Sequence, residues 1–429
     1  MMTSSQFILS LCLGLLVLRW LAATALSNLN KRHVQAHANR IPRECEEIMD
    51  PPTYARSVEY TLAKARFGSL EDNVSTAIII AVLCLKFLPW SQSVWTQSFG
   101  SGAWAGAGWL IAVGMILSLP DIPFSWWSQF RLEDRFGFNR GTPRLWILDR
   151  IKMLALALLI ATPLLALILD LTRRIGPLWW LWAWALLIGF QLLMMIVAPI
   201  FILPLFNKFT PLPDGSLRDR LIRLGQRTGF TAKTIQVVDG SKRSGHSNAY
   251  FTGFGRFRKI VLFDTLISQL TESELEAVLA HEIGHYKRGH LPRMLAWSTL
   301  SLLASFALIG WLAERPELLL AFGFQANAGF APVLLLFGLL SGAFTFWFSP
   351  LTHFWSRKHE YEADAYAVAA VGGPSALSGA LRKLHEKNLS NLTPHPLFSA
   401  FHYSHPTLVE REHSMSRGFS ASPSTSTPT

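Results

Sequence analysis

Residues 178–203 read LWWLWAWALLIGFQLLMMIVAPIFIL, a stretch without a single charged side chain. About 20 consecutive apolar residues are enough for a helix to cross the hydrocarbon core of a bilayer. This stretch is therefore predicted to be a transmembrane helix. Together with six further apolar stretches it predicts seven spans, at about 7–26, 74–88, 102–119, 153–169, 178–203, 291–312 and 328–348.

The composition agrees with a membrane protein. Half of the 429 residues are hydrophobic and 16% are charged, which is below the roughly 25% typical of soluble domains. The net charge of +11 comes from basic residues in the segments between the apolar stretches, not from one dense patch. That distribution favours charges that orient a membrane protein over charges that bind nucleic acid. The lipid bilayer is thus an expected partner and nucleic acid is not.

The basic residues also predict the orientation of the chain. They cluster after the first and third spans, whereas residues 89–102 after the second span carry no charge. Because cytoplasmic loops carry the excess of Lys and Arg, the uncharged loop is expected outside. Counting onward places 205–290 and 351–429 together in the cytoplasm. The first span is expected to be retained, since Arg19 interrupts it and no Lys or Arg precedes it, unlike a signal peptide.

The segment 205–290 has the pattern of a small soluble subdomain. Residues 216–230 have helical periodicity, and 234–239 and 257–266 read as strands of a small β-sheet. Residues 271–290, TESELEAVLAHEIGHYKRGH, read as a helix that opens with a capping box. This helix carries the strongest motif in the chain.

The motif is HEIGH at residues 281–285. His281 and His285 are four residues apart, so on a helix they lie on one face and are able to bind the same Zn²⁺. Glu282 projects about 100° around the helix from His281. It is therefore predicted to act as general base on a metal-bound water rather than as a ligand. The alternative is a surface helix that happens to carry two histidines.

A third ligand is needed for a catalytic zinc site. A metzincin would have Gly at position 288 and His at position 291, but this chain has Arg288 and Leu291. The segment SRKHEYEADAYA, residues 356–367, offers carboxylates instead. Glu360 is the predicted third ligand, with water in the fourth position.

Asp364 lies four residues after Glu360, on the same helical face. It is expected to accept a hydrogen bond from a ligand histidine and to hold that ring in one tautomer. Glu362 and His359 remain alternative ligands from the same segment. A solvated charged helix is the alternative without a metal.

Hydrolysis of a peptide also requires a donor for the developing oxyanion. His405, in the segment HYSHPTLVER, is the candidate, and a plain loop histidine before Pro406 is the alternative. The substrate strand needs a backbone edge to pair with. Asn248, Ala249 and Tyr250 are the candidates for that edge, and an ordinary hairpin is the alternative.

HEIGHYKRGH, SRKHEYEADAYA and HYSHPTLVER, in this order on a seven-span chain, resemble the integral-membrane CAAX prenyl endopeptidases. That family includes the a-factor-converting and prelamin A-processing zinc metalloproteases. RLEDRFGFNR, PLFNKFTPLP and SNAYFTGFG also resemble segments of the family. The likeness covers roughly residues 50–415.

The resemblance implies seven helices around a large intramembrane chamber, with one zinc ion per chain at the cytoplasmic end. It implies that two histidines and one glutamate bind the zinc and that a second glutamate is the catalyst. It also suggests that Asp364 supports a ligand without binding the metal, that Asn248 contacts the substrate and that His405 lies near the oxyanion. The implied ligands and catalyst are His281, His285, Glu360 and Glu282.

The predicted fold is thus mainly α, a multi-pass membrane protein with a gluzincin-like metallopeptidase subdomain that contains a small β-sheet. Its expected parts are five spans with cytoplasmic loops (1–204) and the cytoplasmic HEIGH subdomain (205–290). Spans six and seven (291–350), the cytoplasmic segment with the third ligand (351–415) and a disordered tail (416–429) follow.

The predicted function is a membrane-embedded zinc metalloendopeptidase that cleaves peptide bonds near the cytoplasmic face. Its substrate would be a peptide or protein, prenylated or membrane-associated, and the reaction either removal of a C-terminal tripeptide or membrane-protein quality control. A bacterial plasma membrane is slightly favoured, with the endoplasmic reticulum as alternative. The alternatives in function are a non-catalytic zinc-stabilised scaffold or channel, and a stress-induced protease of the same clan with fewer spans.

Overall fold

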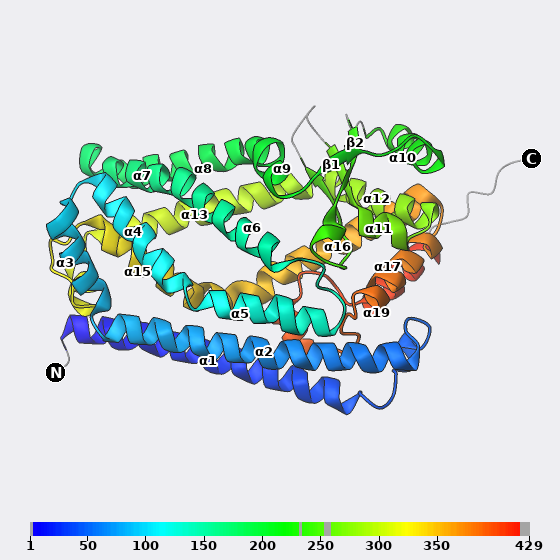
Figure 1. Ribbon diagram of the computed structural model, residues 1–429, viewed down its shortest axis with the longest axis horizontal. Coiled ribbons are helices and arrows are strands. Elements are labelled where there is room, and N and C mark those ends of the chain that lie inside the picture. The colour runs from blue at the N-terminus through cyan, green and yellow to red at the C-terminus, as the bar shows by residue number, and fades with distance from the viewer. Residues whose placement is uncertain (1–2, 231–233, 253–258, 421–429) are drawn as a thin grey trace, which may run out of the picture.

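The computed structural model describes residues 3–230, 234–252 and 259–420, and most of them are helical (Figure 1). The long axis of the molecule follows its longest helices. α1 (Ser4–Ala36) and α2 (Pro51–Cys84) pack side by side along one edge, and α8 (Trp179–Val197) packs on α13 (His290–Ala313) along the opposite edge. The β-sheet and the C-terminal helices gather at one end of this bundle.

Six helical stretches of the described chain are long and apolar enough to cross a membrane. A seventh span arises if α4 (Ala103–Ser118) and the helical stretch Asp121–Glu133, which bend by 43° at their junction, cross together. Each of the seven predicted spans overlaps one of these stretches, which confirms the multi-pass helical fold. The stretches are Ser4–Ala36, Pro51–Cys84, Ala103–Ser118 with Asp121–Glu133, Pro143–Arg174, Gly176–Phe206, His290–Ala313 and Phe330–Val371.

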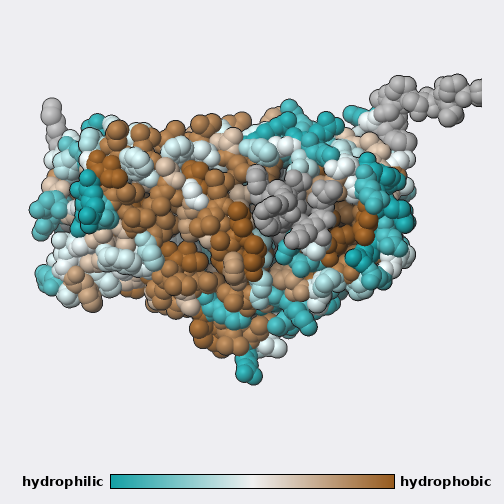
Figure 2. Space-filling view, turned by 90° about the horizontal axis from the view of Figure 1, so that it is seen from above, coloured by the Kyte–Doolittle hydropathy of each residue, from teal (hydrophilic) through white to brown (hydrophobic). Residues whose placement is uncertain are grey.

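The surface has the polarity that a membrane protein needs. Figure 2 shows hydrophobic residues over the middle of one face and hydrophilic residues toward both ends, above all toward the end that carries the sheet. Inside the bundle, Arg19 of α1 forms an ion pair of 2.6 Å with Asp72 of α2. This partner explains how a charged residue is tolerated within the first span.

Several helices extend beyond the thickness of a bilayer. At 1.5 Å per residue, the 33 residues of α1 span about 50 Å, against about 30 Å of hydrocarbon. The seventh span likewise continues from α15 (Phe330–Thr345) through a short turn into α16 (Ser349–Val371). The limit predicted at 350 therefore falls inside one helical stretch, and the segment with the third ligand is an extension of that span.

Two other predicted limits were wrong. The second span was predicted to reach residue 88, but α2 ends at Cys84 because Lys86 adopts a left-handed backbone conformation with φ 56°. The tail was predicted to begin at residue 416, but α19 (Leu408–Ser420) continues through that position. Residues 421–429 lie outside the described residues.

Among residues 3–230, 234–252 and 259–420, the sheet has four strands in the order β1-β2-β4-β3. β2 and β4 are parallel, and the other two pairs are antiparallel. The two predicted strands are present as β2 and β4, and β3 lies at the edge of the sheet. The strands are β1 (Phe209–Pro211), β2 (Thr234–Val238), β3 (Ala249–Thr252) and β4 (Lys259–Phe263).

The remaining helices are parts of the spans, connect them, or enclose the sheet end. Those outside the sheet end are α3 (Phe87–Phe99), α4 (Ala103–Ser118), α5 (Asp121–Trp127), α6 (Pro143–Leu156), α7 (Thr162–Arg174), α9 (Leu203–Phe206) and α14 (Pro316–Ala321). Those at the sheet end are α10 (Ser216–Arg227), α11 (Asp264–Gln269), α12 (Glu272–Lys287), α17 (Ser375–Lys387) and α18 (Pro396–His402).

The predicted helix with the HEIGH motif is α12. It begins as expected, because the Thr271 side chain accepts from the Glu274 backbone N–H and the Glu274 side chain accepts from the Thr271 N–H. α12 packs closely against α16 at Gly284. A Cβ at this glycine would lie 3.0 Å from backbone atoms of Ala363, so a larger residue would push the two helices apart. The small residue inside HEIGH thus allows the close approach that brings α16 to the two histidines.

Candidate metal centre

α12 and α16 together place three ligand-type side chains at one point. His281 Nε2 and His285 Nε2 are 3.1 Å apart. Glu360 of α16 reaches between them, with Oε2 3.5 Å from His281 Nε2 and Oε1 3.3 Å from His285 Nε2. His281 and Glu360 are buried and His285 is partly buried.

This arrangement fits a metal ion by three observations. The buried Oε2 of Glu360 has no hydrogen-bond partner among the described residues. The Nδ1 atom of each ring has a partner on the side away from the cluster, so each Nε2 is left to face the point where a metal would bind. The separations of 3.1–3.5 Å match the ligand spacing of about 3.4 Å that follows from tetrahedral Zn²⁺ with bonds of about 2.0–2.1 Å.

Asp364 lies one helical turn beyond Glu360 and is 1% exposed. Its Oδ1 is 2.8 Å from Nδ1 of His281, as the spacing predicted. Burial lowers the pKa of His281, but the hydrogen bond to Asp364 and the nearby Glu360 carboxylate outweigh burial and raise it to about 9. A carboxylate in this place holds the ring with Nδ1–H outward and Nε2 toward the ligand cluster.

Arg411 is a site residue that the sequence reasoning missed. It is 6% exposed, and its Nε and Nη2 donate to the two oxygens of Asp364 at 2.8 and 2.5 Å. Its Nη1 lies 3.8 Å from Oε2 of Glu360. The only available signal was its position in HYSHPTLVER, the same segment that carries His405.

Glu282 is half-buried beside the cluster. Burial raises the pKa of its carboxyl group, while the neighbouring His281 and His285 act in the opposite direction. A carboxylate with a raised pKa is a stronger base than one at the surface, which suits proton abstraction from water.

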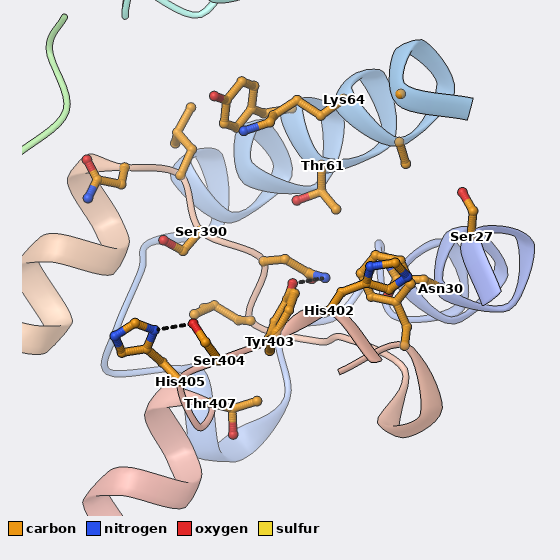
Figure 3. Close-up of a pocket in the computed structure, with 18 of the residues that line it drawn as sticks. Ser27, Asn30, Thr61, Lys64, Ser390, His402, Tyr403, Ser404, His405 and Thr407 are labelled. Carbon is orange, nitrogen blue, oxygen red and sulfur yellow. Dashed lines mark hydrogen bonds between the residues drawn. The ribbon is translucent and has the colours of Figure 1, made fainter. Parts of the chain in front are cut away.

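His405 lies at the open side of the cluster. Its Nε2 is 3.5 Å from Oε1 of Glu360, its Nδ1 is 2.9 Å from the hydroxyl of Ser404, and its side chain is 63% exposed. Figure 3 shows this pair on one wall of a cavity, with Lys64 and Thr61 of α2 across the space. The cavity has a volume of about 820 Å³ and continues from His405 between α1, α2 and the segment 385–409.

The predicted substrate edge is part of β3, the edge strand of the sheet. β3 packs against α12, the helix with both histidines. Asn248 precedes the strand and its Oδ1 accepts from the backbone N–H of Ala249 at 2.8 Å. The backbone of Tyr250 belongs to β3, but its side chain lies outside the part of the chain that the structure describes.

The alternative ligands lie outside the cluster. Oε2 of Glu362 is 3.1 Å from Nε2 of His290, and the ring of His359 stacks on that of His290. His290 is a second site residue that the sequence reasoning missed, since its Nδ1 lies 2.8 Å from Nδ1 of His285. The histidine at the end of HEIGHYKRGH was its only signal.

Two protein-family models together match most of the chain. A family model described as CAAX prenyl protease N-terminal, five membrane helices, matches residues 30–208, and a model of peptidase family M48 matches residues 211–417. CAAX prenyl protease 1 of Saccharomyces cerevisiae is 36% identical over 89% of this chain and 89% of its own. This chain belongs to the CAAX prenyl proteases of peptidase family M48.

Other CAAX prenyl proteases are similarly related. The CAAX prenyl protease 1 homolog of Arabidopsis thaliana is 37% identical over 86% of this chain and 89% of its own. The Homo sapiens homolog is 31% identical over 89% of this chain and 90% of its own. The crystal structure of S. mikatae Ste24p superposes with a TM-score of 0.87 at 34% identity, covering 96% of this chain and 99% of that one.

Membership in this family confirms that the chain is an integral-membrane metalloprotease. The match to a domain of five membrane helices and the full-length similarity to Ste24p contradict the alternative of a protease with fewer spans. They also favour catalysis over a non-catalytic scaffold or channel.

Proposed function

We propose that this chain hydrolyses peptide bonds at a zinc centre held by His281, His285 and Glu360, with Glu282 as general base. The observation that carries the proposal is the convergence of three ligand atoms, with the buried Oε2 of Glu360 lacking a hydrogen-bond partner among the described residues. A closed structural site would have four protein ligands and no need of a base. The half-buried Glu282 beside a three-ligand cluster is therefore suited to turnover.

The chemistry divides between the metal and the protein. When bound, zinc supplies a polarised water and a Lewis acid for the scissile carbonyl. Glu282 takes the proton from the water and delivers it to the leaving amine. His405, on the cavity side of Glu360, donates a hydrogen bond to the oxygen of the scissile carbonyl as negative charge develops there. Asp364, held by Arg411, keeps His281 in the tautomer that binds metal.

The relatives and the cavity support the proposed substrate class. The relatives are named CAAX prenyl proteases, which supports a protein substrate with a prenylated C-terminal cysteine and release of a tripeptide. The cavity of about 820 Å³ beside His405 provides room for a chain next to the centre. Asn248, Ala249 and Tyr250 at the β3 edge are proposed to pair with the substrate backbone as an added strand.

The proposed membrane is that of the endoplasmic reticulum. The relatives named above come from yeast, a plant and a human, so they give no support to the expected bacterial plasma membrane. The sheet end, with the metal centre, is proposed to face the cytoplasm. This orientation follows from the basic segments after the first and third spans.

Cysteine labelling is expected to place the residue 205–290 segment and the chain after 351 on the same side. Lys242→Cys and Arg417→Cys replace exposed residues of these segments, and Ser98→Cys replaces an exposed residue of the uncharged loop. In sealed microsomes of a chain whose own cysteines are replaced, an impermeant maleimide should label the first two and spare the third. Labelling of position 242 without position 417 would refute the topology.

The purified chain is expected to hold about one Zn²⁺, as a site with three protein ligands and water should. Glu360→Ala and His285→Ala should each lose the metal, because two remaining ligands bind it weakly. Elemental analysis after gel filtration measures the stoichiometry. Wild-type protein without zinc would refute the proposed centre. Loss in Glu362→Ala together with retention in Glu360→Ala would show that the other carboxylate is the ligand.

A further inference from the structure

His285 and His281 each have a second interaction on the side away from the ligand cluster. His281 Nδ1 meets Asp364, whose carboxylate is in turn held by Arg411. Within the described chain, Nδ1 of His285 contacts the ring of another histidine rather than a carboxylate, at 2.8 Å from Nδ1 of His290. The other nitrogen of that ring, Nε2, lies 3.1 Å from Oε2 of Glu362.

The end of α12 creates this contact. His290 follows His285 by five residues, which in a continuous helix would place it about 140° away around the axis. Gly289 interrupts the helix with φ 69°, a left-handed conformation that favours glycine. α13 then begins at His290, and this change of direction places the ring of His290 against the ring of His285.

The ring of His290 is fixed in its place. It is 2% exposed and stacks on the ring of His359 with centroids 4.1 Å apart and planes 12° apart. The Glu362 carboxylate is itself flanked by Arg293, with 3.6 Å between Nη1 and Oε2. A buried imidazole with both nitrogens within hydrogen-bond distance of a partner is fully satisfied.

The direction of each hydrogen bond in the series His285–His290–Glu362 follows from the carboxylate at its end. A carboxylate only accepts, so Nε2 of His290 carries the hydrogen and donates to Glu362. Its Nδ1 then has a free lone pair, which accepts the Nδ1–H of His285. Consequently Nε2 of His285 presents its lone pair to the ligand cluster, as a metal requires.

We propose that His290 is a positioning residue that fixes the tautomer and orientation of His285, with Glu362 as its anchor. This inference rests on the proposed zinc centre. α16 then supplies one ligand, Glu360, and two anchoring carboxylates at positions two and four residues later. Asp364 anchors one ligand histidine directly, whereas Glu362 anchors the other through His290. Glu362, which the sequence analysis named as an alternative ligand, thereby supports the ligand His285 through His290.

The test is the rate at which zinc leaves the purified full-length chain for a coloured chelator in detergent. Loss of an outer hydrogen bond to a ligand histidine typically costs 10–100-fold in metal affinity. His290→Leu leaves the Nδ1–H of His285 without an acceptor, so zinc should leave on the order of 10–100-fold faster. In His290→Gln the amide oxygen accepts from His285 and the NH₂ donates to Glu362, so the rate should stay near wild type.

The control for lost packing is His359→Phe, which keeps a stacked ring and changes no contact of His285. Its release rate should equal that of the wild type. Glu362→Leu should also release zinc faster, and the double variant His290→Leu with Glu362→Leu no faster than His290→Leu alone, because the two residues act in series. If His290→Leu does not fold, the rates of zinc release from Glu362→Leu and Glu362→Gln provide the same comparison between an apolar residue and one that still accepts a hydrogen bond.

The outcomes separate this inference from the proposed function. Wild-type release from His290→Leu, equal release from the Leu and Gln variants, or additive effects in the double variant would each overturn the role of His290. A wild-type chain that binds no zinc would instead overturn the zinc centre itself.

Discussion

Glu282→Gln is expected to keep zinc and fold but to lose turnover by about 10² to 10⁴, the usual contribution of a general base. The amide has nearly the shape of the carboxylate, so α12 and its two histidines should remain in place. Gln cannot accept and deliver a proton, so water at the centre loses its base. Cleavage of one peptide, prenylated and unprenylated, by each variant in liposomes measures the effect, with zinc content as the control for folding.

His405→Ala provides the matched comparison at the same centre. Its loss should be about 10² to 10³, because it removes one oxyanion donor while the metal continues to polarise the carbonyl. His405 is exposed and Glu282 half-buried, so neither change should alter the core. Turnover above about a tenth of wild type in Glu282→Gln, with zinc present, would contradict its role as general base.

Signals that are local in the sequence predicted most of the fold. Hydropathy predicts spans because the bilayer admits few other structures. Each of the seven predicted spans overlaps one of the six long apolar helices or the bent pair. The capping box and the strands of the sheet depend on neighbouring residues in the same way. One wrong limit lies where a single residue departs from the local pattern, at the left-handed backbone of Lys86. The limits at 350 and 416 were wrong because helices continue through both positions.

The metal cluster was predictable because chemistry restricts it to few residue types at fixed spacing. Arg411 and His290 were not, although both lie within quoted segments. An arginine in a polar segment usually reads as solvated, and only the packing of α19 against α16 buries Arg411 beside Asp364. His290 contacts His285 only because Gly289 breaks the helix between them. Such contacts depend on tertiary structure and leave no periodic pattern.

Asp364→Ala is expected to be the most destabilising single change at the centre. Asp364 is 1% exposed and accepts hydrogen bonds from Arg411 and His281. Its removal leaves the buried guanidinium of Arg411 without its main partner, and breaking a buried ion pair in this way costs about 3–5 kcal/mol. The midpoint of thermal unfolding in detergent, followed by tryptophan fluorescence with a chelator present, measures this cost apart from zinc binding.

The double variant Asp364→Ala with Arg411→Leu distinguishes the unpaired charge from a simple cavity. An apolar residue in place of the guanidinium leaves no buried charge, and replacing a whole buried pair by apolar groups is often neutral. The double variant should therefore unfold at a higher temperature than Asp364→Ala alone. If Asp364→Ala instead acts by leaving a cavity, adding Arg411→Leu should lower the unfolding midpoint further, since it removes more contacts. An unfolding midpoint of Asp364→Ala equal to that of the wild type would contradict the pairing itself.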